Sequence, residues 1–146
     1  MTTDDLRYAP VRAGLAREYR DRYGVGVEEE MSRWPDDDFT PPRGGLVLLL
    51  LHGETVAGGG FHSPDGRQVE LRRIWTDPRY RRRGLARRVV TEIEARAVRL
   101  GCRRAHLLTG PRQPEADALY RTMGYRPVPV TLPAGEPPAL RYEKDL

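Results

Sequence analysis

The sequence has little of the chemistry that cross-links a small protein from within. Cys102 is the only cysteine, which excludes an internal disulfide framework. The three histidines, His52, His62 and His106, do not follow the spacing of a structural zinc site, and we expect no metal. A chain of 146 residues is long enough to bury a sizeable core without such help. We therefore expect one domain, residues 1–146, held together by packing.

A long hydrophobic run is also missing. The longest, GLVLLLL at 45–51, has the length of a strand and falls far short of the roughly 20 residues that span a bilayer. The first residues, MTTDDLRYAP, lack the basic and then apolar order of a secretion signal. The composition, 38% hydrophobic and 32% charged, is typical of a soluble globular protein. We expect a cytoplasmic protein that does not bind a membrane.

Lysine is almost absent. Lys144 is the single lysine among 25 basic residues, so arginine is the general choice of this chain and its abundance alone says little about function. The formal net charge of +4 favours anionic partners. Net charge does not separate a phosphate-bearing cofactor from nucleic acid, and the positions of the arginines must decide.

The order of periodic segments predicts the fold class. Apolar residues at helical spacing predict helices at about 10–23, 85–100 and 114–123. Strands are expected at 46–51, 54–61, 68–76, 103–110, 125–130 and 140–146. The dipeptide HG at 52–53 and the tetrapeptide SPDG at 63–66 are typical of hairpin turns. A helix, two hairpins and then alternating helices and strands indicate an α/β protein with a mixed sheet covered by helices.

The strand expected at 68–76 reads QVELRRIWT. Regular alternation would place its even-numbered side chains on one face of the sheet and its odd-numbered side chains on the other. Glu70 and Ile74 would then share a face.

The segment PRYRRRGLARR at 78–88 joins this strand to the helix expected from residue 85. The start of a helix exposes about four unpaired backbone N–H groups and the positive end of the helix dipole, and Gly84 lets the backbone approach a ligand there. Arg81, Arg82 and Arg83 add positive charge, which suits a pyrophosphate. The alternatives are a solvated basic surface and direct nucleic-acid binding. The sequence has no recognisable DNA-reading module or stacking motif that favours the latter.

Two motifs carry a resemblance to a known family. The pattern Arg81-x-x-Gly84-x-Ala86, which follows a strand and Asp77-Pro78, resembles the acyl-coenzyme A signature of the GNAT family of N-acetyltransferases. The stretch EADALYRTMGY at 115–125 is similar to the family's Ala-x-x-Leu-Tyr-x-x-x-Gly-Phe/Tyr ending. The resemblance covers most of the chain and is strongest over 68–126. It implies a GNAT-type mixed central sheet, largely antiparallel, with helices on both faces, and an acetyl-CoA-dependent N-acetyltransferase.

The resemblance also implies which residues bind the coenzyme. In the family, the strand before the signature separates from its neighbour, and its unpaired backbone groups bind the pantetheine arm. Those positions are Ile74, Trp75 and Thr76. The pyrophosphate would rest on the backbone of the loop, which comprises Arg81, Arg82, Arg83, Gly84, Leu85 and Ala86. Gln113 stands where the family often has an asparagine before the last helix.

Two residues are candidates for the chemistry. Tyr120 matches the family tyrosine that protonates the departing thiolate, with a core aromatic as the alternative. The attacking amine must lose a proton, and Glu70 is the candidate base, directly or through water. It lies four residues before Ile74, as the catalytic glutamate of histone-acetylating members does. A structural ion pair with the adjacent arginines is the alternative. Many relatives have an acid in the next strand, where this chain has Leu108.

The acceptor half of the site is expected in variable loops, here 25–44 and 128–139. Trp34 and Phe39 either line that half or anchor the loop. The resemblance therefore implies a small-molecule or peptide amine as acceptor, with a homodimer as one option. The rival interpretations are a non-catalytic acyl-CoA-binding regulatory module, an arginine-rich nucleic-acid-binding domain, and an enzyme that uses another acyl donor.

Overall fold

A six-stranded sheet forms the centre of the protein, with the strand order β1-β2-β3-β4-β6-β5. The computed structural model describes residues 5–23, 36–109, 114–130 and 140–146. The strands are β1 Gly44–Leu51, β2 Glu54–His62, β3 Gln68–Thr76, β4 Arg104–Thr109, β5 Arg126–Val128 and β6 Leu140–Asp145. Neighbouring strands run antiparallel except β3 and β4, which are parallel. The sheet is therefore mixed and largely antiparallel, as expected.

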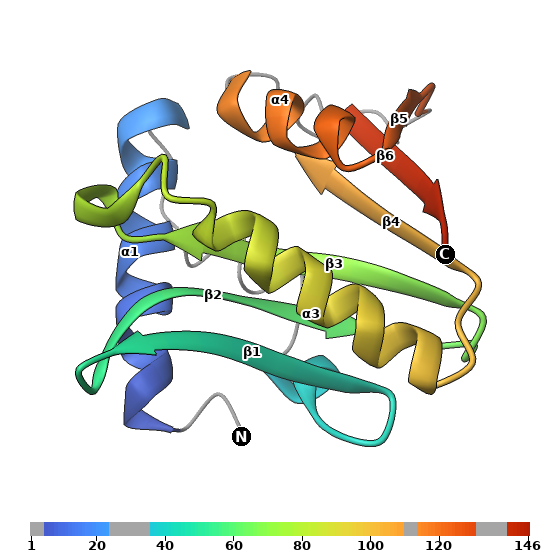
Figure 1. Cartoon of the computed structure of the whole chain (residues 1–146), viewed down its shortest axis with the longest axis horizontal. Coiled ribbons are helices and arrows are strands. Elements are labelled where there is room, and N and C mark those ends of the chain that lie inside the picture. The colour runs from blue at the N-terminus through green and yellow to red at the C-terminus, as the bar shows by residue number, and fades with distance from the viewer. Residues whose placement is uncertain (1–4, 24–35, 110–113, 131–139) are drawn as a thin grey trace.

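Helices cover both faces of this sheet (Figure 1). They are α1 Ala9–Tyr23, α3 Leu85–Arg99 and α4 Pro114–Thr122, with short 3-10 turns at Leu6–Tyr8, Asp36–Phe39 and Pro78–Tyr80. Helix α1 lies on one face, while α3 and α4 lie on the other. Each helix and strand expected from the sequence is present, with ends that differ by a few residues at most. The structure contains no helix that is long and apolar enough to cross a membrane among the residues it describes.

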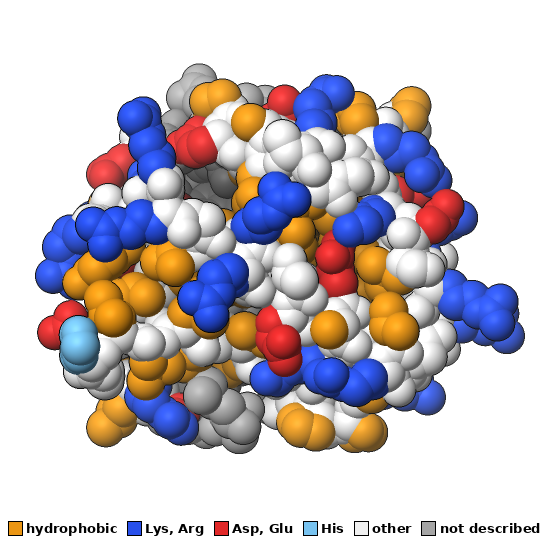
Figure 2. Space-filling view, in the orientation of Figure 1, with side chains coloured by type: hydrophobic (Ala, Val, Ile, Leu, Met, Phe, Trp, Pro, Cys, Tyr) orange, Lys and Arg blue, Asp and Glu red, His pale blue; other side chains and the backbone are white. Residues whose placement is uncertain are grey.

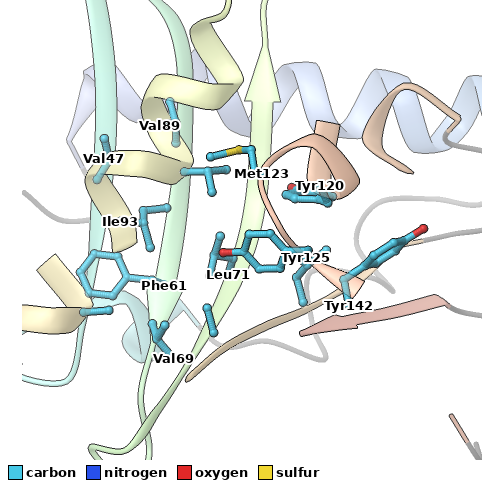
Figure 3. Close-up of a cluster of buried hydrophobic side chains, with 14 of the residues drawn as sticks. Val47, Phe61, Val69, Leu71, Val89, Ile93, Tyr120, Met123, Tyr125 and Tyr142 are labelled. Carbon is cyan, nitrogen blue, oxygen red and sulfur yellow. The ribbon is translucent and has the colours of Figure 1, made fainter. Parts of the chain in front are cut away.

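Each face of the sheet has its own hydrophobic core. The larger core lies beneath α3 and α4 and includes Val69, Leu71, Ile93 and Tyr120 (Figure 3). The smaller core lies between α1 and the sheet and consists of Tyr8, Val11, Leu15, Phe39, Leu46 and Trp75. Burying a side chain of this size contributes about 1.5–3 kcal/mol, so these two layers fix the helices to the sheet.

The hairpin turns have the backbone geometry that their residues favour. His52 and Gly53 both have positive φ values, 51° and 83°, which is the pattern of a type I′ turn between β1 and β2. In the turn between β2 and β3, the Asp65 carboxylate accepts hydrogen bonds from the backbone N–H groups of Arg67 and Gln68. These two turns set the register of the first three strands.

A bulge in β3 breaks the expected alternation of its side chains. Arg72 pairs with Gly60 and Trp75 pairs with Gly58, so two residues of β3 stand opposite Gly59. Arg73, inside the bulge, has a φ of 56°. The prediction that Glu70 and Ile74 share a face is therefore wrong. Ile74 packs on the core beneath α3, whereas Glu70, between two residues of that core, points to the α1 side.

Candidate active site

A gap opens in the sheet between β3 and β4. The two strands pair at only three positions, Gln68 with Arg104, Val69 with Ala105 and Glu70 with His106. Beyond this point β3 continues along β2 as far as Thr76, while β4 continues along β6. Figure 1 shows the two strands separating towards the end of the molecule where α4 lies. The separation expected for the strand before the arginine segment is therefore present.

The edge of β3 that faces this gap contains the three residues expected to bind pantetheine. Ile74 and Thr76 lie on the α3 side of the sheet and Trp75 is buried on the α1 side, with 5% of its surface exposed. Among the described residues, the buried Oγ1 atom of Thr76 has no hydrogen-bond partner. A buried hydroxyl without a partner is costly, and a ligand in the gap would supply the missing bond.

The arginine segment bends the chain from β3 into α3 through two residues with left-handed backbone. Arg82 has a φ of 65°, and Gly84, directly before the helix, has a φ of 75°. Gly84 has no side chain to cap α3, and the first turn of the helix has no acidic residue. The first backbone N–H groups of α3, from Leu85 on, therefore lack a side-chain acceptor from the cap residue. This geometry suits an anion.

Side chains of the same segment are partly engaged by the protein itself. Arg81 forms an ion pair with Glu18 of α1, which ties the segment to that helix. Arg83 stacks on the ring of Tyr80 with its guanidinium carbon 5.3 Å from the ring centroid. Figure 2 shows blue basic side chains at this end of the molecule and also across the rest of the visible face. The arginines add positive charge near the start of α3, where the backbone amides are the expected anion contacts.

Asp77 fixes the start of the segment. Its carboxylate accepts hydrogen bonds from the backbone N–H and the side chain of Arg79, 2.9 Å each at the closest. These hydrogen bonds hold the pKa of Asp77 below its ordinary value, with the contact to the Arg79 side chain as the largest cause.

Tyr120 projects from α4 into the larger core and is 4% exposed. Its ring meets that of Tyr125 edge-on, with centroids 5.5 Å apart, and lies 6.0 Å from the ring of Tyr142 (Figure 3). The hydroxyls of the two neighbours are engaged by acids: Tyr125 donates to Glu94 and Tyr142 to Asp117. These aromatic contacts hold the Tyr120 ring in one position. The proton-donating role of Tyr120 stays a prediction.

Glu70 lies at the closed end of the gap, at the last position where β3 and β4 still pair. Its side chain is 14% exposed, and Oε1 accepts a hydrogen bond from Arg72. The other carboxylate oxygen, Oε2, lies 3.9 Å from Nε2 of His106. The ion pair with an adjacent arginine, which the sequence offered as the alternative to a catalytic role, is present. It occupies one carboxylate oxygen and leaves the other facing β4.

The structure leaves some of the expected site residues undescribed and decides the role of another. Gln113, as well as Trp34 and most of the loops expected to form the acceptor half, lies outside the described residues. Phe39 is 1% exposed in the core against α1, with the Arg73 guanidinium carbon 4.6 Å from its ring centroid. Phe39 thus anchors its loop. Among the described residues, no group of three or more His, Cys, Asp or Glu side chains is arranged to hold a metal ion.

Sequence reasoning missed His106. The family's second acid in β4 corresponds to Leu108, and His106 lies two positions earlier on the same face of the strand. The parallel register of β3 and β4 brings His106 next to Glu70. Side-chain parity within β4 was the available signal, since positions 106 and 108 share a face of any regular strand.

Known proteins resemble this chain in sequence pattern and in fold. Residues 10–125 match the family model described as the acetyltransferase (GNAT) family. No curated protein matches the chain. A GNAT-family acetyltransferase of Staphylococcus aureus has a TM-score of 0.81 at 13% identity over 99% of this chain and 96% of that one. An acetyltransferase of Thermus thermophilus has a TM-score of 0.74 at 23% identity, over 100% and 94%. The PaiA N-acetyltransferase of Thermoplasma acidophilum, solved in complex with coenzyme A, has a TM-score of 0.74 at 12% identity, over 100% and 96%.

Proposed function

Because the chain belongs to the GNAT family of acetyltransferases, we propose that it transfers the acetyl group of acetyl-CoA to a primary amine of a small molecule or peptide. The transfer is a direct attack by the amine while both substrates are bound. One observation carries this proposal: β3, which among the described strands pairs with β4 only up to Glu70, leads through the arginine segment into a helix whose start has no side-chain cap. A diphosphate and a peptide-like arm are the two ligand parts that these surfaces suit.

The coenzyme would bind along these two surfaces. The diphosphate accepts hydrogen bonds from the first backbone amides of α3, within the positive field of the helix dipole and the surrounding arginines. The amides of the pantetheine arm pair with the edge of β3 at Ile74–Thr76, in the position that a neighbouring strand would take. The similar PaiA N-acetyltransferase of Thermoplasma acidophilum was solved in complex with coenzyme A, which supports this choice of ligand.

The reaction needs two proton transfers. The amine attacks the thioester carbonyl carbon, and its nitrogen loses one proton to Glu70, directly or through a water. The carbon–sulfur bond then breaks, and Tyr120 donates a proton to the departing sulfur. The first role is supported by Oε2 of Glu70, the carboxylate oxygen that the Arg72 ion pair does not occupy. The fixed ring of Tyr120 supports the second.

Calorimetry with acetyl-CoA is the first test. We expect saturable binding with a dissociation constant in the micromolar range. A screen for release of free coenzyme A thiol, over polyamines, amino acids, aminoglycosides and peptide N-termini, then identifies the acceptor. Undetectable binding at millimolar acetyl-CoA would refute the proposal. Tight binding without thiol release from any amine would instead favour the acyl-CoA-binding regulatory module.

Replacing Tyr120 tests the acid. Tyr120→Phe should keep the affinity for acetyl-CoA and lower kcat by about 10²-fold or more, as the loss of a positioned proton donor does. Tyr125→Phe is the matched control, because it removes a hydroxyl from the same aromatic cluster that already donates to Glu94. The control should turn over at nearly the normal rate. An unchanged kcat in Tyr120→Phe would remove the acid assignment while leaving the transferase reaction intact.

A further inference from the structure

A row of titratable side chains crosses the sheet at the closed end of the gap. The strand register pairs His62 with Glu70, Glu70 with His106, and His106 with Glu143. Each of these residues is adjacent in its strand to a residue of the core beneath α3, namely Phe61, Leu71, Leu107 and Tyr142. The whole row therefore points to the opposite face, the face that α1 covers in part.

Glu70 meets only one of the two histidines directly. Its Oε2 atom lies 3.9 Å from Nε2 of His106, and both side chains are about 15% exposed, 14% for Glu70 and 15% for His106. Nε2 of His62 turns away, towards Oδ1 of Asp38 at 4.0 Å. The Nδ1 atom of His106 is buried and has no hydrogen-bond partner within the part of the chain that the structure describes. Because no hydrogen bond fixes a tautomer at Nδ1, the ring is able to present the Nε2 lone pair to Glu70.

Charged groups on three strands surround the His106 ring. Glu70 and Arg72 face it from β3, Arg141 and Glu143 face it from β6, and Arg104 lies two positions before it on β4. Burial lowers the pKa of His106 below its ordinary value, as the largest cause, and Arg141 and Arg72 lower it further. Glu70 and Glu143 act in the opposite direction without reversing the shift. The ring is therefore neutral at neutral pH and able to accept a proton.

We propose that His106 receives from Glu70 the proton that the acceptor amine loses, and so completes the path from the amine to solvent. The inference rests on the proposed acetyltransferase function. As the neutral amine attacks the thioester carbonyl carbon, its nitrogen gives one proton to the Glu70 carboxylate. Glu70 then passes the proton to Nε2 of His106, directly after a small rotation or through one water. The imidazolium releases it to solvent, and both side chains return to their starting charge. His106 acts through Glu70 and does not touch the amine.

The pH dependence of turnover tests this role. In the wild-type enzyme, kcat should fall as the pH falls through the pKa of His106, which burial holds below its ordinary value. His106→Gln should lower kcat about tenfold at neutral pH and abolish this acidic limb, with the KM for acetyl-CoA unchanged. Imidazole added to His106→Ala should restore part of the lost rate. His62→Gln is the matched control, because it removes the other histidine neighbour of Glu70 and should keep the limb.

A nuclear magnetic resonance titration of the His106 ring in the full-length protein gives a second, activity-independent readout. Because Glu70 raises the pKa of His106, Glu70→Gln should lower it. Normal turnover with an unchanged acidic limb in His106→Gln would overturn the inference. A pKa of His106 that is the same in the wild-type protein and in Glu70→Gln would also overturn it. Absence of thiol release from the wild-type protein would refute the proposed function instead, and the titration would still decide whether the two groups are coupled.

Discussion

Gly14, on helix α1, allows the helix backbone to lie directly on the indole of Trp75. A Cβ atom built at Gly14 would come within 2.0 Å of Nε1 and 2.2 Å of Cε2 of this ring. Trp75 is 5% exposed and enclosed by the other side chains of the core against α1. Neither the ring nor the helix has room to move by the ångström or more that an ordinary contact requires. Gly14→Ala is therefore a sharp test of how α1 packs.

Two opposing effects set the size of the change. Alanine is favoured over glycine inside a helix by about 1 kcal/mol, so helix propensity alone would make Gly14→Ala stabilising. Overpacking a filled core costs about 1–3 kcal/mol, and this overlap with a rigid ring belongs at the upper end. We expect a net loss of about 1–2 kcal/mol, which lowers Tm by roughly 3–6 °C in a domain of this size. Since Trp75 is part of the unpaired β3 edge, acetyl-CoA binding should weaken as well.

Thermal and urea unfolding measure the effect of Gly14→Ala on the free energy of unfolding in two backgrounds. The proteins compared are the wild type, Gly14→Ala, Trp75→Phe and the double variant. Phenylalanine lacks the indole atoms that a Cβ at position 14 would meet. In the Trp75→Phe background, Gly14→Ala should therefore become stabilising by about 1 kcal/mol, as propensity dictates. The same sign of effect in both backgrounds would show that contact with the indole does not control position 14.

Two further changes probe the loop and the aromatic cluster. Gly84→Ala and Gly53→Ala should destabilise the protein to a similar extent, by about 1–2 kcal/mol, because both sites have positive φ, 75° and 83°, and open space around the added methyl. Only Gly84→Ala should weaken acetyl-CoA binding in calorimetry, and equal affinities would argue against the start of α3 as the diphosphate site. Burial and Glu94 raise the pKa of Tyr125 above its ordinary value of 10.0. Because the folded protein holds the Tyr125 proton more tightly than the unfolded chain, its folding stability is unaffected below pH 10.0 and falls as the pH rises above that value. Tyr125→Phe should therefore make the alkaline fall in the free energy of unfolding less steep. An equally steep fall in unfolding experiments would contradict the raised pKa.

Local sequence signals predicted most of the fold. The bounds of β3 agree with those expected, and the hairpins follow from turn residues that adopt positive φ at His52, Gly53 and Gly66. The bulge at Arg73 was not predictable in this way. Arginine has no preference for left-handed backbone, and the glycine that accommodates the bulge, Gly59, stands on the neighbouring strand. Such a feature depends on tertiary packing, which overrides local preference.

The candidate site was predictable where it depends on consecutive residues. The strand, the arginine segment and the start of α3 are contiguous, so one stretch of sequence contains most of the expected coenzyme contacts. The Glu70–His106 contact instead joins two residues that are 36 positions apart in the chain, and it depends on the register of the parallel strands β3 and β4. No local pattern contains that register. The loops expected to form the acceptor half follow no periodicity in their sequence, so the sequence does not identify the proposed acceptor.

The narrow junction of β3 with β4 also affects how the sheet deforms. Strands β1, β2 and β3 form one part of the sheet, and β4, β5 and β6 form the other. Three residue pairs between β3 and β4 join the two parts, whereas the strands within each part pair over most of their length. A sheet bends most easily where the fewest residue pairs join its strands. We therefore expect the two parts of the sheet to twist against each other about the paired positions of Glu70 and His106. Widening the gap at its open end changes distances there far more than at the junction. We therefore expect Glu70 and His106 to lie where the two parts of the sheet move least relative to each other.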